Sequence, residues 1–247
     1  MSRWIVFFAF VYVLSLTSIA PALADTPTEP SLSSGRTVRS SGTAHSRISI
    51  TRLKESHRVR QLYNKALNAW RKQKPSEAQH RLEQALELYP EFPEALTFYG
   101  GIHAAARQWS LAEEKLRAAI QSDPAYSPAY VILAGVYNSQ RRFDDAQRAT
   151  NQALATGADT WDVQYEIARV LIGKQQYEKA LAITEEALRS KEHGSLLHLA
   201  KAHALLGLRM YSQAVAELRV YLHDQPSRDE SQGARDLLQE VERDTTR

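Results

Sequence analysis

The feature that most constrains this chain is a pattern of small and large side chains that returns every 34 residues. Counting from residue 59 gives five frames with no insertion or deletion, which are 59–92, 93–126, 127–160, 161–194 and 195–228. Copies in register indicate an array of one repeated unit, and such an array has to be interpreted as a whole before its parts.

Two positions of the frame hold only small residues, and a third holds a bulky one. The small positions, the eighth and the twentieth, are Ala66, Gly100, Ala134, Ala168 and Ala202, and Ala78, Ala112, Ala146, Ala180 and Ala214. The bulky position, the seventeenth, is Pro75, Trp109, Phe143, Tyr177 and Tyr211. Small residues let two helix backbones approach closely, and a large residue fills the space beside their crossing. Each frame therefore predicts two short amphipathic helices joined by a tight turn.

Proline ends three of the frames, at Pro90, Pro124 and Pro226, where it prevents the second helix from continuing. This order of small, large, small and proline at a period of 34 residues resembles the tetratricopeptide repeat family. The resemblance covers residues 59–228, or 170 of the 247 residues. It implies an all-α fold, a right-handed α-solenoid of five helix-turn-helix repeats plus a C-terminal capping helix. The first frame departs most from the pattern, because Pro75 replaces the aromatic residue.

Residues 1–24 have the three parts of a secretory signal peptide. Arg3 precedes an apolar run from Trp4 to Ala20, and small residues at Ala22 and Ala24 suit a cleavage site. The run is short for a membrane span, which needs about 20 apolar residues. We expect cleavage after Ala24 and a periplasmic or secreted protein. The alternative is an uncleaved membrane anchor with the repeats outside the cytoplasm.

The two segments that flank the repeats have different compositions. Residues 25–58 are rich in Ser, Thr, Gly, Pro and Arg up to about residue 51, and predict a flexible linker that runs into the first helix. A short basic interaction arm is the alternative for this segment. Residues 229–247 predict a capping helix and tail, because Ser227 and Glu230 form a capping box before an apolar stripe. That stripe is Ala234, Leu237, Leu238 and Val241.

Composition excludes several classes of function. The chain has no cysteine, so it has neither a disulfide framework nor a thiol site. Its formal net charge is +3, and removal of residues 1–24, which contain one cation and no acid, lowers it to +2. A net charge this close to neutral gives no case for a nucleic-acid-binding protein, which would want a basic stripe.

Nothing in the sequence predicts an enzyme, a cofactor site or a metal site. His193, His198 and His203 are spaced by five, which turns successive rings away from one another on a helix. His103 falls in a packed position, and we interpret it as a core residue. We interpret acid pairs such as Glu113-Glu114 as part of a solvated face. No nucleophile elbow, phosphate loop or zinc-protease motif occurs.

The resemblance implies that the first helices of the repeats line a concave groove that binds a peptide or helix of another protein. The candidate residues of this groove lie on the side of each first helix away from the packed stripe. They are Tyr63, Trp70, Thr97, Gly101, Val131, Gly135, Asn138, Tyr165, Arg169, Leu199 and His203. A lining this apolar suits an amphipathic helix or an extended apolar peptide. The alternatives are that the aromatic residues belong to the core and that the two glycines serve helix packing.

The sequence thus predicts a non-enzymatic protein–protein interaction scaffold in the cell envelope. We expect it to bind a partner segment during assembly of a larger complex, such as secretion, pilus or outer-membrane machinery. An accessory domain that recognises a ligand or glycan is the alternative. Partners are expected to be proteins and not nucleic acid, with a membrane involved only if the N-terminal segment is retained.

Overall fold

The computed structural model describes residues 43–190, 192–224 and 228–245. All regular elements in these ranges are α-helices, which confirms the predicted all-α solenoid of helix-turn-helix repeats. The predicted signal peptide, the first part of the linker and the capping residue Ser227 lie outside the described residues. None of the described helices is both long and apolar enough to cross a membrane.

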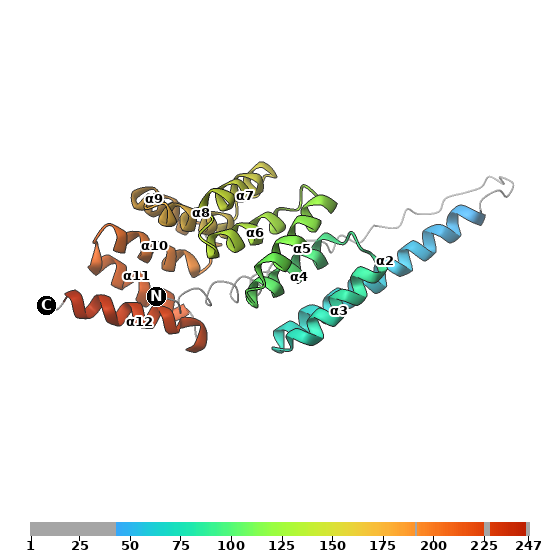
Figure 1. Cartoon of the computed structure of the whole chain (residues 1–247), viewed down its shortest axis with the longest axis horizontal. Coiled ribbons are helices and arrows are strands. Elements are labelled where there is room, and N and C mark those ends of the chain that lie inside the picture. The colour runs from blue at the N-terminus through green and yellow to red at the C-terminus, as the bar shows by residue number, and fades with distance from the viewer. Residues whose placement is uncertain (1–42, 191, 225–227, 246–247) are drawn as a thin grey trace, which may run out of the picture.

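The helices form five antiparallel pairs followed by one more helix (Figure 1). The pairs are α2 (Thr43–Arg71) with α3 (Pro75–Leu88), α4 (Pro93–Ala105) with α5 (Trp109–Ser122), α6 (Ser127–Ser139) with α7 (Phe143–Ala155), α8 (Trp161–Gly173) with α9 (Tyr177–Leu188), and α10 (Leu196–Gly207) with α11 (Tyr211–Asp224), and the last helix is α12 (Arg228–Thr245). The pairs follow one another along an arc.

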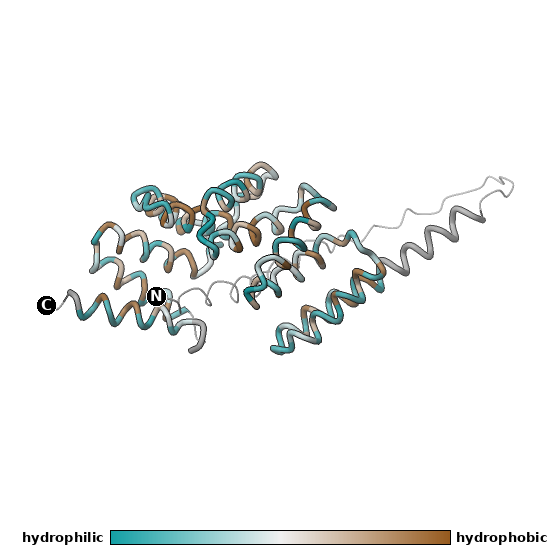
Figure 2. Tube along the Cα trace, viewed as in Figure 1, coloured by the Kyte–Doolittle hydropathy of each residue, from teal (hydrophilic) through white to brown (hydrophobic). Residues whose placement is uncertain are grey.

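Contacts between pairs show which helices lie on the inside of this arc. The first helices α4, α6, α8 and α10 pack on one another in succession, whereas successive second helices make weaker contacts. Spacing is narrower on the concave side of a curved stack, so the first helices line that side. Figure 2 shows teal and brown residues alternating along helices such as α3 and α12, as expected for amphipathic helices with one packed face.

The same turn joins the two helices of every pair. The middle of the three residues between the helices, the fifteenth of the frame, has a left-handed backbone with φ between 56° and 62° in Gln73, Arg107, Arg141, Gln175 and Arg209. In the third pair, the N–H of the following residue, Arg142, donates to Tyr137 O at 2.9 Å and so closes the end of α6. None of the five is glycine, although a left-handed conformation costs other residues about 1–2 kcal/mol.

The small positions lie where the pattern places them. All nine alanines at the eighth and twentieth positions have no exposed surface. Gly100 is buried as well, and a Cβ atom added there would lie 2.7 Å from Leu116 Cγ. The repeated alanines therefore set the distance between the two helices of each pair, and the second pair needs glycine because Leu116 fills the space.

The bulky position connects the third pair to the fourth and the fourth pair to the fifth. The Phe143 ring lies against Gly173 and the Tyr177 ring lies against Gly207, so closely that a Cβ atom on either glycine would overlap the ring. Both glycines are at the thirteenth position of the following frame. An aromatic residue of one repeat thus rests in a notch that glycine leaves in its neighbour.

The two ends of the array differ from the central repeats. α2 begins at Thr43, within the segment predicted as a linker that runs into the first helix, and no Gly or Pro interrupts residues 43–74. At the other end, Ala234 and Val241 of α12 are buried, and Leu237 packs against the same core cluster as the fully buried Tyr221. α12 thus covers the exposed edge of the last pair, which a solenoid requires.

Replacing Gly173 by alanine is expected to lower the free energy of unfolding by about 1–3 kcal/mol, because the added methyl group overlaps the Phe143 ring. Denaturant unfolding followed by circular dichroism measures the change. Gly233→Ala in α12 is the matched control, since no atom lies within 4 Å of its added Cβ. Equal stability of the two variants would contradict the proposed contact.

Candidate functional site

The inner face comprises the groove-facing residues of the first helices α2, α4, α6, α8 and α10. Seven of the predicted groove residues are buried, namely Trp70, Thr97, Gly101, Val131, Asn138, Tyr165 and Leu199. The other four are partly exposed, namely Tyr63, Gly135, Arg169 and His203. The accessible surface of the predicted set therefore lies at two places, one on α2 and one across α6, α8 and α10.

The aromatic residues on α2 belong to the core of the first two pairs. The rings of Tyr63 and Trp70 each lie 6.1 Å from the ring of Phe98 and meet it edge to face. Burial, with a smaller contribution from the charge of Glu94, raises the pKa of the Tyr63 hydroxyl to about 12. Core packing is thus the interpretation that the structure supports for Tyr63 and Trp70, and they lie apart from the polar residues described next.

A polar cluster spans the middle of the inner face, and Glu166 of α8 is at its centre. The Glu166 side chain has no exposed surface. Its Oε2 accepts hydrogen bonds from Asn138 Nδ2 of α6 at 2.7 Å and from Arg169 Nη1 at 2.9 Å. Asn138 Nδ2 also donates to the Glu166 backbone oxygen at 3.1 Å. These bonds connect two successive first helices and hold the carboxylate between them.

Gly135 makes room for this carboxylate. A Cβ atom at Gly135 would lie 3.2 Å from Glu166 Oε1, closer than side chains normally approach. Close packing against the neighbouring helix, one of the two interpretations of this glycine, therefore accounts for it.

Burial and the neighbouring polar groups shift the pKa of the Glu166 carboxyl in opposite directions. Burial raises the pKa of the Glu166 carboxyl, and the charge of Arg169 and the hydrogen bond from Asn138 act against that rise. Burial and the positive charge of Arg169 lower the pKa of His203, on α10, to about 4. The cluster thus joins three successive first helices through one carboxylate, one guanidinium and one imidazole that is neutral at pH 7.

Two buried oxygens on the inner face have no hydrogen-bond partner in the described structure. They are Thr97 Oγ1 on α4 and Asn138 Oδ1 on α6. A buried acceptor without a partner costs roughly 1–3 kcal/mol. Both atoms lie beneath the surface, so a bound molecule would supply a donor only after a neighbouring side chain moved aside.

Reasoning from the sequence missed Glu166, the centre of the cluster. Glu166 occupies the sixth position of its frame, where Phe98, Ile132 and Ala200 stand in other frames. The sequence could have indicated Glu166, because it is an acid at a frame position that is mostly apolar in the other repeats.

His103 and Glu113, interpreted from the sequence as a core residue and a surface residue, differ in how well the structure supports those interpretations. His103 is buried, and its Nδ1 lies 2.6 Å from Gln108 Oε1, in agreement with a core role. Glu113 differs from the expectation of a solvated residue, because it accepts from the Tyr137 hydroxyl at 2.9 Å and pairs with Arg142 at 3.0 Å. Among the described side chains, no group of three or more His, Asp or Glu residues is placed to hold a metal ion.

The free energy of unfolding is expected to fall as the pH is lowered from 6.5 to 4, because unfolded His203 takes up a proton near 6.5 and the folded form only near 4. His203→Gln should make this decline shallower by about 1–3 kcal/mol, since each pKa unit is worth about 1.4 kcal/mol and partial exposure reduces the effect. Denaturant unfolding at a series of pH values measures it. The exposed His80 provides the control His80→Gln, and equal slopes for the two variants would contradict the assignment.

Arg169→Met is expected to lower the free energy of unfolding by about 3–5 kcal/mol, because it leaves the buried Glu166 carboxylate without its cation. The added change Glu166→Gln should restore part of the loss. Arg189→Met is the matched control, because Arg189 and Glu186 form a pair of the same spacing that is more than 70% exposed and is worth at most about 1 kcal/mol. Similar losses in both single variants would refute a buried cluster.

Comparison with known proteins identifies the family to which this fold belongs. The tetratricopeptide repeat model matches residues 63–127 and 136–195. None of the curated proteins that were compared matches the chain. A thermophilic TPR protein from Thermus thermophilus aligns with a TM-score of 0.64 at 17% identity, over 74% of this chain and 98% of that one.

Two further solved structures have the same architecture. PilF of Pseudomonas aeruginosa aligns with a TM-score of 0.61 at 19% identity, over 78% of this chain and 88% of that one. PilW, a type IV pilus biogenesis factor, aligns with a TM-score of 0.62 at 16% identity, over 75% of this chain and 91% of that one. At these identities the likeness concerns the fold. With five helix pairs in register and a family model that matches half of its length, the chain belongs to the tetratricopeptide repeat family, whose members are protein–protein interaction scaffolds and generally not catalysts.

Proposed function

We propose that this chain is an exported, non-catalytic adaptor of the cell envelope that holds a segment of a partner protein on its inner face. The family supports a binding scaffold. The three-part pattern of residues 1–24 supports export, with a periplasmic or secreted protein as the expected product and an anchored one as the alternative.

The observation that carries the proposal is the polar cluster and its unsatisfied acceptor. Asn138 is fixed by two hydrogen bonds from its Nδ2 to Glu166, so its Oδ1 has a defined position and still lacks a donor. A backbone N–H of a bound segment would supply that donor. Arg169 and His203, the partly exposed members of the cluster, would contact the same segment.

The cluster favours binding over catalysis. Glu166 is paired with Arg169 and hydrogen-bonded to Asn138, so its carboxylate is committed to holding α6 and α8 together. His203 is neutral beside Arg169 and has no acid or nucleophile in a catalytic arrangement with it among the described residues. These residues form a rigid, pre-positioned surface, and rigidity reduces the entropy lost on binding.

The larger complex is proposed by analogy with proteins that have the same solenoid. PilW is described as a type IV pilus biogenesis factor, and PilF has a comparable arrangement of helices. Assembly of a pilus, or of related secretion or outer-membrane machinery, is therefore the process in which we propose this adaptor acts.

Asn138→Ala is expected to reduce partner binding about tenfold or more, because a buried hydrogen bond from the partner is lost. The tagged chain is recovered from envelope extract of its host after cross-linking, and the captured proteins are quantified by mass spectrometry. Asn151→Ala, at an exposed position of α7, is the matched control and should capture the partner normally.

Two outcomes would count against the adaptor. Equal capture by the Asn138 and Asn151 variants would place the contact away from the inner face. A chain that captures no protein but binds sugars saturably on a glycan array would support the ligand-recognition alternative.

A further inference from the structure

The connections at the two ends of the helices differ in the sign of their charges. The basic edge consists of the turns within the pairs, residues 71–74, 105–108, 139–142, 173–176 and 207–210, which contain eight Lys or Arg and no Asp or Glu. The acidic edge consists of the first three junctions between pairs, residues 87–95, 121–129 and 155–163, which contain six Asp or Glu and no Lys or Arg. The fourth junction, residues 189–195, contains both signs and is not part of the acidic edge. Because the helices are antiparallel, these turns and junctions lie at opposite ends of the stack.

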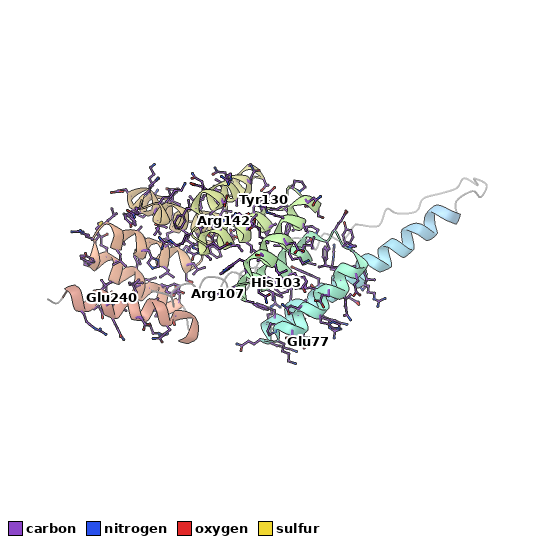
Figure 3. All side chains as sticks on the ribbon, in the orientation of Figure 1. Glu77, His103, Arg107, Tyr130, Arg142 and Glu240 are labelled. Carbon is purple, nitrogen blue, oxygen red and sulfur yellow. The ribbon has the colours of Figure 1, made fainter. Side chains whose placement is uncertain are left out.

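Contacts show that successive turns lie next to one another along the basic edge. Arg142, in the third turn, pairs at 3.0 Å with Glu113, which follows the second turn. Lys174, in the fourth turn, pairs at 2.7 Å with Asp144, which follows the third turn. Arg107 and Arg142 are labelled at the second and third of these turns in Figure 3. The basic edge is therefore a continuous row.

Neighbouring junctions also lie next to one another. Ser122, in the second junction, donates to the backbone oxygen of Glu91 in the first junction at 2.5 Å. Trp161, in the third junction, lies against Gly194 in the fourth, which is not part of the acidic edge.

Ion pairs within the chain neutralise only some of the charged residues in the two edges. Asp144 and Asp145, which begin α7 beside the basic edge, are paired with Lys174 and Arg142. Five cations of the basic edge have no ion pair among the described residues, namely Arg71, Lys72, Arg107, Arg141 and Arg209. The six acids of the acidic edge also have none within the described ranges, namely Glu87, Glu91, Glu94, Asp123, Asp159 and Asp162.

Helix dipoles do not explain this segregation. At both edges, each connection joins the C-terminus of one helix, which favours cations, to the N-terminus of the next, which favours anions. Dipoles alone would place both signs at both edges. The left-handed position of the turn is Arg in three pairs and Gln in the other two, so it adds cations to this edge and no acid.

We propose that the basic edge of one copy docks against the acidic edge of another, so that copies of this chain associate side by side. The two edges are opposite ends of the same helices, so they have the same repeat spacing and the same curvature. A copy displaced along the helix axes therefore presents a row of acids that matches its neighbour's row of cations. This contact is heterologous and does not close, so it produces open arrays. The inner face of each copy remains free for a partner.

Association through these edges should depend strongly on salt. Exposed ion pairs are individually weak, and salt screens them over about 10 Å at 0.1 M ionic strength. Sedimentation velocity of the protein purified from its host is expected to show a sedimentation coefficient that rises with concentration in about 20 mM salt. The rise should disappear in about 0.5 M salt.

Two charge-reversal variants separate this proposal from nonspecific aggregation. The first, Arg71→Glu with Lys72→Glu, Arg141→Asp and Arg209→Asp, leaves Arg107 as the one unpaired cation among the described residues of the basic edge, against four acids, and so makes this edge acidic. Asp tolerates the left-handed positions. The second, Glu87→Lys with Glu91→Lys, Asp123→Lys and Asp159→Lys, leaves four cations against the two remaining acids, Glu94 and Asp162, and makes the acidic edge basic. Each variant alone should remain monomeric in low salt, because both of its edges then have the same sign. An equimolar mixture should associate again.

The mixture is the decisive sample. Association of either variant alone to the extent of the unchanged protein, or failure of the mixture to associate, would overturn the proposal. So would an unchanged protein that stays monomeric in low salt and instead binds phosphatidylglycerol vesicles through Arg141 and Arg209, because the basic edge would then serve a lipid surface.

Discussion

The joining of the last three helix pairs depends on one repeated contact, in which an aromatic side chain of one pair rests against a glycine of the next pair. Phe143 on Gly173 and Tyr177 on Gly207 are its two instances. The alanines of the eighth and twentieth positions set the spacing within a pair, but they do not join one pair to another. Since each unit of a solenoid contacts only its neighbours, this contact transmits the geometry of one repeat to the next.

The polar cluster uses the geometry that this contact provides. Glu166 can be buried because Gly135 leaves space for its carboxylate and because Asn138 and Arg169 supply donors from two helices. A buried charge network contributes little net stability compared with well-packed apolar residues. Its presence in the middle of the inner face is better explained by a demand for a defined binding surface. The charged edges are a separate property, because they lie at the ends of the helices and leave that surface free.

Much of this fold could be predicted from the sequence, because the repeat is recognised by small and large side chains at fixed positions of the frame. The positions of Ala112, Ala146 and Ala180 predicted close helix packing, and all three are fully buried. The inner face was harder to predict. Period alone cannot say whether Tyr63 and Trp70 face a groove or a core, since both interpretations require aromatic residues at helical spacing. Glu166 was missed because its importance depends on Asn138 and Arg169, which lie on the same face only once the repeats are stacked. The contacts of Gly173 and Gly207 were missed because each glycine packs against an aromatic residue of the preceding frame, and a comparison of equivalent positions does not reveal contacts between frames.

A double-mutant cycle on Tyr177 and Gly207 tests the central contact most directly. The unfolding free energies of Tyr177→Ala, Gly207→Ala and the double variant are compared with that of the unchanged chain. If the ring and the glycine fit each other, the added methyl group costs little once the ring is gone, so the two losses should fall short of additivity by about 1 kcal/mol or more. Losses that add fully would show that the two residues do not interact, and the account of how the repeats are joined would be wrong.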